Sequence, residues 1–447
     1  MNFSLTSKRI AAPVCLATFA FIIFAAAMQA ATGQRRRTPA ATRPSKTDTA
    51  AQDNRDGASL LSEAAGLLQA GRLDAAEPLV RRAITLTPEN ADAHNLLGAI
   101  LDQRGRAQEA EREYRTALRL NPKAVGAFAN LGVLLARTHH PAEAVQAFQS
   151  ALRLAPDHPQ ASFNLGLTLY QLNRLEEAAK WLEVAARVSP DRPEPLYSLG
   201  LVASARGQSE AAIDYWRRTL ALQNDFAEAN FLLAEELRKS GRLEDSKEFY
   251  ERALAQDSAR LVHYARLGGV LLLLGQNEGA LDVFRRGAEK FPQIAEAHYF
   301  VAIAARGKGD YDLAETSLRK SLSLEPDNPD ALAQLGFVMG ERGRFAEAEQ
   351  LLRRALTFSR DKHFMAHYDL GRLLVKQRRY DEAIPVLKRG AMLNARYPGI
   401  HYQLFLALSR LKRKEEADRE LALFKQLEEA SKNRRRGDYN TEDLIPQ

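Results

Sequence analysis

The chain has 447 residues, of which 63 are Lys or Arg and 56 are Asp or Glu, so its formal net charge is +7. A hydrophobic fraction of 45% excludes a wholly disordered polymer. The single cysteine, Cys15, excludes an intramolecular disulfide and a Cys-based zinc site, and the positive charge raises nucleic acid or an anionic membrane surface as partners.

Residues 1–30 have the features of a targeting segment. Lys8 and Arg9 precede an uncharged run, 10–27, whose length lies between that of a signal core and that of a membrane span. Ala25 and Ala27 form a small-residue cleavage site. We therefore predict a signal peptide cleaved near residues 27–31, with export to the periplasm, the cell envelope or the exterior. The alternative is an uncleaved anchor in the inner membrane, with membrane association through residues 10–27.

Residues 31–56 contain no aromatic residue and no Leu, Ile or Val. Such a segment cannot bury enough apolar surface to offset the entropy lost on ordering, so we predict a disordered basic linker. Residues 432–447 are predicted to be a disordered polar tail.

A period of 34 residues governs the chain from Gly57 onward. Units start at 57, 91, 125, 159, 193, 227, 261, 295 and 329, and one extra residue near Asp361 moves the last two starts to 364 and 398. Position 20 is Ala in ten of the eleven units, and position 8 is Gly or Ala in all but the last, which has Phe405. Prolines in the same phase are Pro88, Pro122, Pro156 and Pro190.

Each unit has the apolar spacing of two helices. In the third unit, Phe128, Leu131 and Leu135 lie at helical spacing, and Phe148 and Leu152 repeat that spacing in a second stretch. Glycine is frequent at position 15, where a first helix would end, and proline at position 32 would end the second. The small residues at positions 8 and 20 would let the two helices pack closely.

This unit resembles the tetratricopeptide repeat, and the resemblance covers residues 57–431. It implies an all-α fold, a right-handed superhelical solenoid of antiparallel helix pairs with eleven repeats. Phe405 and Phe424 stand at normally small positions of the last unit, which we expect to be an atypical cap.

The positive charge lies outside the repeats. Residues 1–56 carry eight basic and three acidic side chains, whereas the acids and bases of the repeats are interspersed and nearly balanced. A basic groove is absent from this pattern, so we predict no nucleic-acid partner.

The sequence contains no phosphate-binding loop, nucleophile elbow or H-E-x-x-H motif. The only candidate metal pair is His363 and His367, but His367 shares position 4 with His94, His298 and His401, which favours a packing role. We predict no enzymatic activity and no cofactor or metal; a metal-binding or enzymatic solenoid is the least favoured alternative.

In the family that the sequence resembles, the first helices line an inner groove with positions 2, 5, 6, 9, 12 and 13. Asn130 and Asn164 both occupy position 6, and an amide there could bind a peptide backbone because it both donates and accepts. The other predicted contacts are Tyr170, Arg238, Arg266 and Arg306. We predict a scaffold or adaptor in the cell envelope that binds an extended peptide or helix of a protein partner. The alternative is a membrane-anchored assembly scaffold on the cytoplasmic side.

Overall fold

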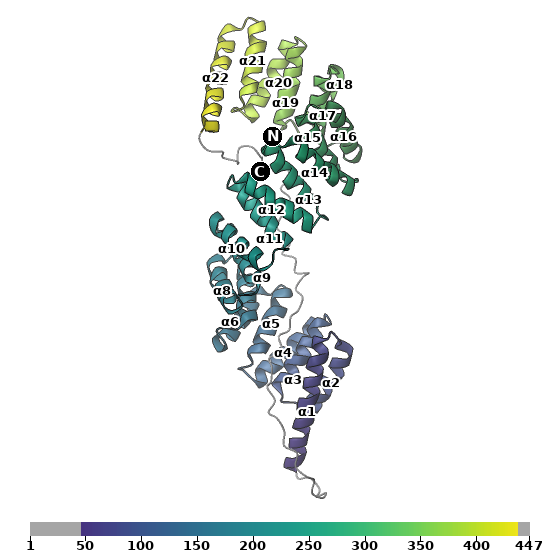
Figure 1. The fold of residues 1–447 in the computed structure, drawn as a ribbon, viewed down its shortest axis with the longest axis vertical. Coiled ribbons are helices and arrows are strands. Elements are labelled where there is room, and N and C mark those ends of the chain that lie inside the picture. The colour runs from purple at the N-terminus through teal and green to yellow at the C-terminus, as the bar shows by residue number, and fades with distance from the viewer. Residues whose placement is uncertain (1–45, 437–447) are drawn as a thin grey trace. The chain divides into compact units, whose positions relative to one another are not determined.

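The computed structural model describes residues 46–436, with side chains over 53–430. This part of the chain forms 22 helices and no strand, and the helices follow one another as eleven pairs. Figure 1 shows the pairs in chain order. The predicted all-α solenoid of antiparallel helix pairs is thereby confirmed.

The helices divide into two compact units, which we call the N-terminal unit (up to Gln223) and the C-terminal unit (from Asn224). The helices of the N-terminal unit are α1 (Lys46–Gln69), α2 (Leu73–Leu86), α3 (Ala91–Gln103), α4 (Ala107–Leu120), α5 (Val125–Arg137), α6 (Pro141–Leu154), α7 (Pro159–Gln171), α8 (Leu175–Val188), α9 (Pro193–Ala205) and α10 (Ser209–Leu222).

The helices of the C-terminal unit are α11 (Ala227–Lys239), α12 (Leu243–Gln256), α13 (Leu261–Leu273), α14 (Asn277–Lys290), α15 (Ala295–Gly307), α16 (Tyr311–Leu324), α17 (Pro329–Glu341), α18 (Phe345–Phe358), α19 (Phe364–Lys376), α20 (Tyr380–Leu393), α21 (Pro398–Arg410) and α22 (Lys414–Arg436). Each unit has its own apolar core, which extends from Ala64 to Val202 in the N-terminal unit and from Ala234 to Ala417 in the C-terminal unit.

The two helices of a pair pack closely at one point, where the side chain at position 24 lies over the small residue at position 8. We call this point the notch. A Cβ added to Gly98 would lie 2.6 Å from the Tyr114 ring, and one added to Gly132 would lie 2.6 Å from the Phe148 ring. In each case a large residue at position 24 fills the space above a glycine at position 8. The small residue predicted at position 8 is therefore a steric requirement of the close helix pair.

The turn within a pair requires a residue with positive φ. Gly71 has φ +70°, its N–H donates to the Leu68 carbonyl at 3.0 Å, and the Arg72 N–H donates to the Leu67 carbonyl at 2.8 Å. This pattern satisfies carbonyls that the end of α1 would otherwise leave unpaired. Units without glycine at this position use His139, Asn173, Arg378 and Lys412, all with positive φ.

The extra residue predicted near Asp361 lies between α18 and α19. Arg360 and Asp361 both have positive φ, and the Asp361 N–H donates to the Leu356 carbonyl at 2.7 Å. This wider turn between α18 and α19 accommodates the extra residue.

Both ends of the described chain are more helical than expected. Helix α1 begins at Lys46 and so includes the last part of the predicted linker, 31–56, while α22 ends at Arg436, inside the predicted tail, 432–447. Adding residues to a packed helix is far less costly than nucleating a new one. The predicted signal peptide or anchor, 1–30, lies outside the described residues. Among the helices described, none combines the length and apolar character needed to cross a bilayer.

The odd-numbered helices lie on the inner side of each unit. Within the N-terminal unit α1, α3, α5, α7 and α9 contact one another in succession, as do α13, α15, α17, α19 and α21 in the C-terminal unit. The described even-numbered helices make no comparable contacts with one another. Within each unit these odd-numbered helices therefore form the more closely packed face.

Candidate functional site

The amide predicted at position 6 of the third unit pairs with the preceding unit. Asn130 on α5 donates from Nδ2 to Oδ1 of Asn95 on α3, at 3.0 Å. Both side chains are half-buried on the inner helices. The pair links neighbouring inner helices, so part of the hydrogen-bonding capacity expected for a ligand is used within the protein.

Asn164 and Tyr170 lie on α7, also half-buried. Among the described residues, no side-chain hydrogen bond is formed by the Asn164 amide, so its donor and acceptor stay available. Burial raises the pKa of the Tyr170 hydroxyl, which therefore stays neutral and able to donate. In the N-terminal unit these two residues are the predicted contacts best able to bind a ligand.

Arg238 and Arg266 converge on one carboxylate, Glu235 of α11. The guanidinium of Arg238 lies 3.2 Å from Glu235, and Nε of Arg266, on α13, lies 2.9 Å from Glu235 Oε1. Tyr250 donates its hydroxyl to the same oxygen. Burial, followed by the charge of Glu235, raises the pKa of Tyr250 well above its usual value. The two predicted cations are thus brought together around one carboxylate, which balances one of their two charges.

Arg306, on α15, belongs to a different group. Its Nη1 donates to Gln334 Oε1 at 2.5 Å, and its guanidinium carbon lies 5.0 Å from the centre of the Phe337 ring. The guanidinium of Arg372, on α19, lies 4.9 Å from the same ring centre and 2.9 Å from Glu341. Two cations therefore contact one aromatic ring on the inner helices.

A buried carboxylate lies beside these arginines. Asp369 on α19 is 6% exposed, and its Oδ1 lies 3.8 Å from Arg372 without a hydrogen bond. Burial raises the pKa of Asp369 to about 6, against the opposing effects of Arg372 and Arg306. We call this group the Phe337 cluster; its members are Arg306, Gln334, Phe337, Glu341, Asp369 and Arg372.

Aromatic rings extend the Phe337 cluster along the inner helices. The Tyr368 and Tyr397 ring centres are 5.0 Å apart, and Phe364 and Tyr397 are 5.1 Å apart. Sequence reasoning predicted Arg306 but missed Asp369, Arg372 and Tyr368. The signal was present, because these residues occupy the inner positions 6, 9 and 5 of the tenth unit.

The candidate histidine pair is held by internal contacts. His363 Nε2 lies 3.0 Å from Asp330 Oδ1, and its Nδ1 accepts the N–H of Ala366 at 3.0 Å. His367 Nε2 lies 3.0 Å from Asp361 and 3.2 Å from the Asp361 carbonyl oxygen. Other histidines at position 4 contact a carbonyl in the same way: His94, His298 and His401. Within the described residues, no set of three or more His, Cys, Asp or Glu side chains is placed to hold a metal.

Models of known protein families match residues in both units. The family model described as tetratricopeptide repeat matches residues 61–125 and 129–193, and the model of the cilia and flagella-associated protein 70 C-terminal domain, itself made of these repeats, matches residues 217–438. The chain is a tetratricopeptide repeat protein.

Individual similar proteins match the repeat chain only in part. The probable biofilm formation methyltransferase WspC of Pseudomonas putida is 33% identical over 87 residues, which make up 20% of this chain and 20% of that protein. The chain thus spans about a fifth of the length of this curated relative.

Solved structures cover about half of the chain. The pilF protein of Pseudomonas aeruginosa has 23% identity and a TM-score of 0.42, covering 48% of this chain and 98% of its own. PilW, described as a type IV pilus biogenesis factor, has 20% identity and a TM-score of 0.43, covering 49% of this chain and 99% of its own. YrrB, described as having an unusual peptide-binding site, has 22% identity and a TM-score of 0.35, covering 41% and 94%.

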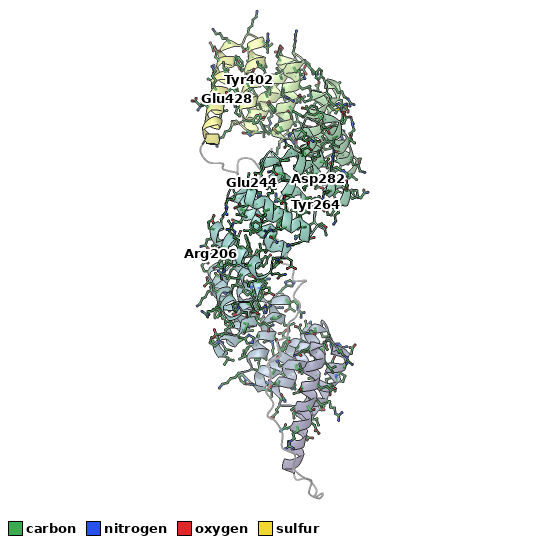
Figure 2. All side chains as sticks on the ribbon, in the orientation of Figure 1. Arg206, Glu244, Tyr264, Asp282, Tyr402 and Glu428 are labelled. Carbon is green, nitrogen blue, oxygen red and sulfur yellow. The ribbon has the colours of Figure 1, made fainter. Side chains whose placement is uncertain are left out.

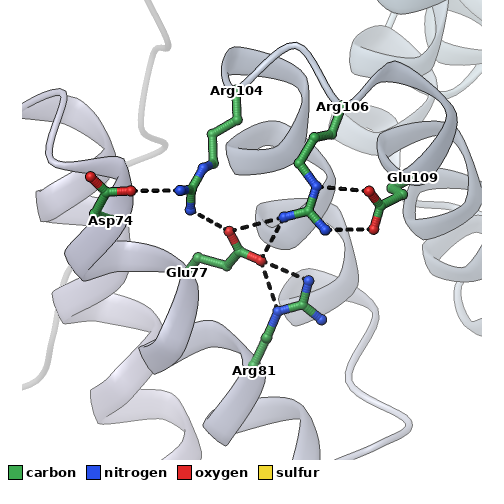
Figure 3. A network of polar contacts seen from close by, with 6 residues as sticks. All are labelled: Asp74, Glu77, Arg81, Arg104, Arg106 and Glu109. Carbon is green, nitrogen blue, oxygen red and sulfur yellow. Dashed lines mark hydrogen bonds and ion pairs between the residues drawn. The ribbon is translucent and has the colours of Figure 1, made fainter.

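The repeats also carry an ion-pair network that sequence reasoning missed. Figure 3 shows Glu77 of α2 among Arg81, Arg104 and Arg106, with Asp74 and Glu109 at the edges. The same six positions recur between α16 and α18, as Asp312, Glu315, Arg319, Arg342, Arg344 and Glu347. These contacts join the second helix of one repeat to the turn of the next, which is a structural role.

Proposed function

We propose that this repeat protein is a non-enzymatic scaffold or adaptor whose inner helices bind an extended peptide or a helix of a partner protein. The Phe337 cluster is the observation that carries the proposal. Half-buried Phe337 and Tyr368 lie beside two arginines, and aromatic and arginine side chains contribute most of the binding energy at many protein interfaces. Stacked helix pairs present such residues along an extended inner surface.

Each unit has polar groups on its inner helices that a peptide could satisfy. Arg306 and Arg372 can donate to peptide carbonyls or carboxylates, while Asn164 can both donate and accept. Arg238 and Arg266 contribute less to this proposal because both already pair with Glu235. The methyltransferase-named relative shares only a fifth of its length with this chain, so we carry none of its activity over.

The test uses one inner-face variant in each unit, Asn164→Ala with Tyr170→Ala and Phe337→Ala with Arg372→Ala. Arg187→Ala on α8 and Arg286→Ala on α14 are the controls, since both side chains are more than half exposed on even-numbered helices. Proteins captured from the native host are quantified by mass spectrometry, and the binding of one purified partner is then measured by titration.

We expect an inner-face variant to bind that partner with an affinity lower on the order of tenfold or more, while the controls bind it as the natural chain does. Helical circular dichroism must stay unchanged in all four proteins. If the inner-face and control variants bind the partner equally well, the inner helices are not the binding surface.

We further propose that the scaffold works in the cell envelope after export. The proposal is supported by Lys8 and Arg9, the apolar run 10–27 and the Ala25-x-Ala27 site. The alternative is a membrane-anchored scaffold on the cytoplasmic side, supported by the basic residues 35–37 after the run. Mass spectrometry of the N-terminus decides: a start near residues 28–32 means cleavage and export, whereas an intact Met1 means an anchor.

A further inference from the structure

Two arginines share one carboxylate on the inner helices of the C-terminal unit. We call this group the Glu235 cluster; its members are Glu235 and Arg238 of α11, Tyr250 of α12 and Arg266 of α13. Figure 2 labels Glu244 on α12 and Tyr264 on α13, two of the three helices that carry the cluster.

The Glu235 cluster has a surplus of one positive charge. Among the described residues, no second carboxylate lies within ion-pair distance of either guanidinium. Lys239, the next cation on α11, is paired with Glu236. The side chains of Arg238 and Arg266 are only 15% and 23% exposed, so water compensates their charges incompletely. Within the described part of the chain, the surplus charge therefore has no counter-ion.

The two guanidiniums also have unused hydrogen-bond donors. Arg238 donates from Nη2 to Glu235 Oε2 at 3.2 Å, while its Nε is buried without a partner. Nε of Arg266 lies 2.9 Å from Glu235 Oε1 but forms no hydrogen bond, and neither terminal nitrogen of Arg266 forms one with the described residues. Since each terminal nitrogen of a guanidinium carries two N–H donors, those of Arg266 stay available to a ligand.

An open space adjoins these donors at Gly269 of α13. Gly269 occupies position 9, and among the eleven repeats only this one has glycine there. A Cβ added to Gly269 would meet nothing within 4 Å. In the tenth repeat the side chain at position 9, Arg372, lies against positions 9 and 13 of the preceding inner helix. The missing side chain at Gly269 therefore leaves space facing the same two positions of α11, which are Glu235 and Lys239.

Charge and surroundings indicate which ligand fits this space. A surplus of one charge matches one carboxylate, whereas a phosphate group carries about −1.5 to −2 at pH 7. Leu232 and Leu272, one helical turn from Glu235 and Gly269, are half-buried and offer apolar surface to the rest of a side chain. The inner helices continue beyond the cluster, from α13 to α21, so a bound segment can continue along them. An acidic side chain within a segment therefore fits better than a terminal carboxylate.

We propose that the Glu235 cluster binds an aspartate or glutamate side chain of the partner protein, in the space beside Gly269. The partner's carboxylate accepts hydrogen bonds from Arg266 and Arg238 and supplies the second negative charge that the two guanidiniums lack. The proposal rests on the proposed function, because the partner must lie along the inner helices. It adds a selection for acidic segments to that function.

The selection is tested with a phage library of random peptides of about 12 residues, which span roughly 40 Å when extended. The peptides are fused to the phage through their C-termini, so that no terminal carboxylate is offered. The natural chain should enrich peptides with Asp or Glu at one fixed position. One enriched peptide is synthesised with this acid and with the matching amide, and fluorescence anisotropy measures both affinities. We expect the acidic form to bind more tightly, on the order of tenfold.

Three variants locate this preference for the acid. Arg238→Gln with Arg266→Gln should abolish it, so that both peptides bind alike. Gly269→Leu should weaken the acidic peptide on the order of tenfold, because the added side chain fills the space that the carboxylate needs. Glu235→Gln should strengthen the acidic peptide, because it removes the internal carboxylate that competes for the two guanidiniums.

Two controls match these changes away from the inner helices and from the cluster. Arg286→Gln on α14 alters a side chain that is 57% exposed, and Gly66→Leu on α1 adds a side chain where a Cβ also meets nothing within 4 Å. Both controls should keep the preference for the acid. Helical circular dichroism must be the same for every variant.

This inference and the proposed function fail in different ways. Enriched peptides without a fixed acid, a preference that survives the double arginine variant, or weaker binding of the acidic peptide to Glu235→Gln would each overturn the inference. The proposed function stands in those cases if Phe337→Ala with Arg372→Ala still weakens the enriched peptides. Peptides that bind every inner-face variant as they bind the natural chain would overturn both.

Discussion

Gly200 lies directly beneath the indole of Trp216. A Cβ on Gly200 would stand 2.6 Å from both Cδ1 and Cε2 of the ring, and Trp216 Nε1 donates to the Tyr197 carbonyl at 3.2 Å. Trp216 is 1% exposed, so the ring has neither space nor freedom to move. The close approach of α9 and α10 therefore depends on the absence of a single methyl group.

Gly200→Ala should accordingly destabilise the protein, by about 1–3 kcal/mol, as expected when a tightly packed site is overfilled. The urea midpoint of helical circular dichroism measures the effect. Gly66→Ala on α1 is the matched control, because a Cβ there meets nothing within 4 Å. That substitution should be neutral or stabilising, since alanine favours the helix. Equal midpoints for Gly200→Ala and the natural chain would show that the notch does not restrict packing.

The sequence can predict this notch because it is local and periodic. Gly200 and Trp216 lie 16 residues apart in one repeat, and the same spacing recurs in Gly98 with Tyr114 and Gly132 with Phe148. The turns are predictable for the same reason. Each is formed by one short stretch whose carbonyls need donors, as at Gly71.

Contacts between repeats are less predictable. Asn130 was expected to align with Asn164 at the same position, but it hydrogen-bonds to Asn95, which occupies a different position in the preceding repeat. Glu235 likewise forms ion pairs with Arg238 of its own helix and with Arg266 of another helix. Such pairings depend on the rotation and offset between successive repeats, which the period alone does not determine.

Glu77→Gln should weaken the stacking of the first repeat on the second. Glu77 accepts hydrogen bonds from Arg81, Arg104 and Arg106, so its loss leaves three cations without their shared partner. We expect a loss of about 1 kcal/mol, because these arginines keep access to water. Glu111→Gln is the control, since among the described residues Glu111 forms an ion pair only with Arg115 of its own helix. It should shift the urea midpoint less than Glu77→Gln does.

The network also predicts a dependence on pH. Burial raises the pKa of Glu77, but hydrogen bonds from Arg81 and Arg104 and the charges of Arg81 and Arg106 outweigh it and place the pKa below its usual 4.5. A lowered folded-state pKa means that the stabilisation is present above pH 4.5 and is lost as the pH falls through the folded-state value. The difference in midpoint between Glu77→Gln and the natural chain should therefore shrink on acidification. A constant difference down to pH 3 would contradict this account.

Asp369 should show the opposite dependence. Its pKa of about 6 lies above the usual 3.8 because the carboxylate is buried, so the folded state binds the proton more tightly than the unfolded chain does. Stability is then lost as the pH rises from about 4 to 6 and stays lower above that range. Asp369→Asn should stabilise the protein by about 3 kcal/mol at pH 7.5 and by little below pH 4. Lower stability of Asp369→Asn at pH 7.5 would mean that its pairing with Arg372 outweighs burial.

Arg378 offers a stabilising substitution at a turn. Its φ of +63° is unfavourable for a residue with a side chain, and its exposed position offers no packing that requires arginine. Arg378→Gly should therefore stabilise the protein by about 0.5–1 kcal/mol, after allowing for the greater freedom of glycine in the unfolded chain. The adjacent Gln377 has φ −82° and accepts a hydrogen bond from Arg379 at 3.0 Å, so Gln377→Gly gains no relief, loses that bond and should destabilise. The urea midpoint should rise for Arg378→Gly and fall for Gln377→Gly, and a midpoint that falls for Arg378→Gly would contradict the relief of an unfavourable backbone conformation.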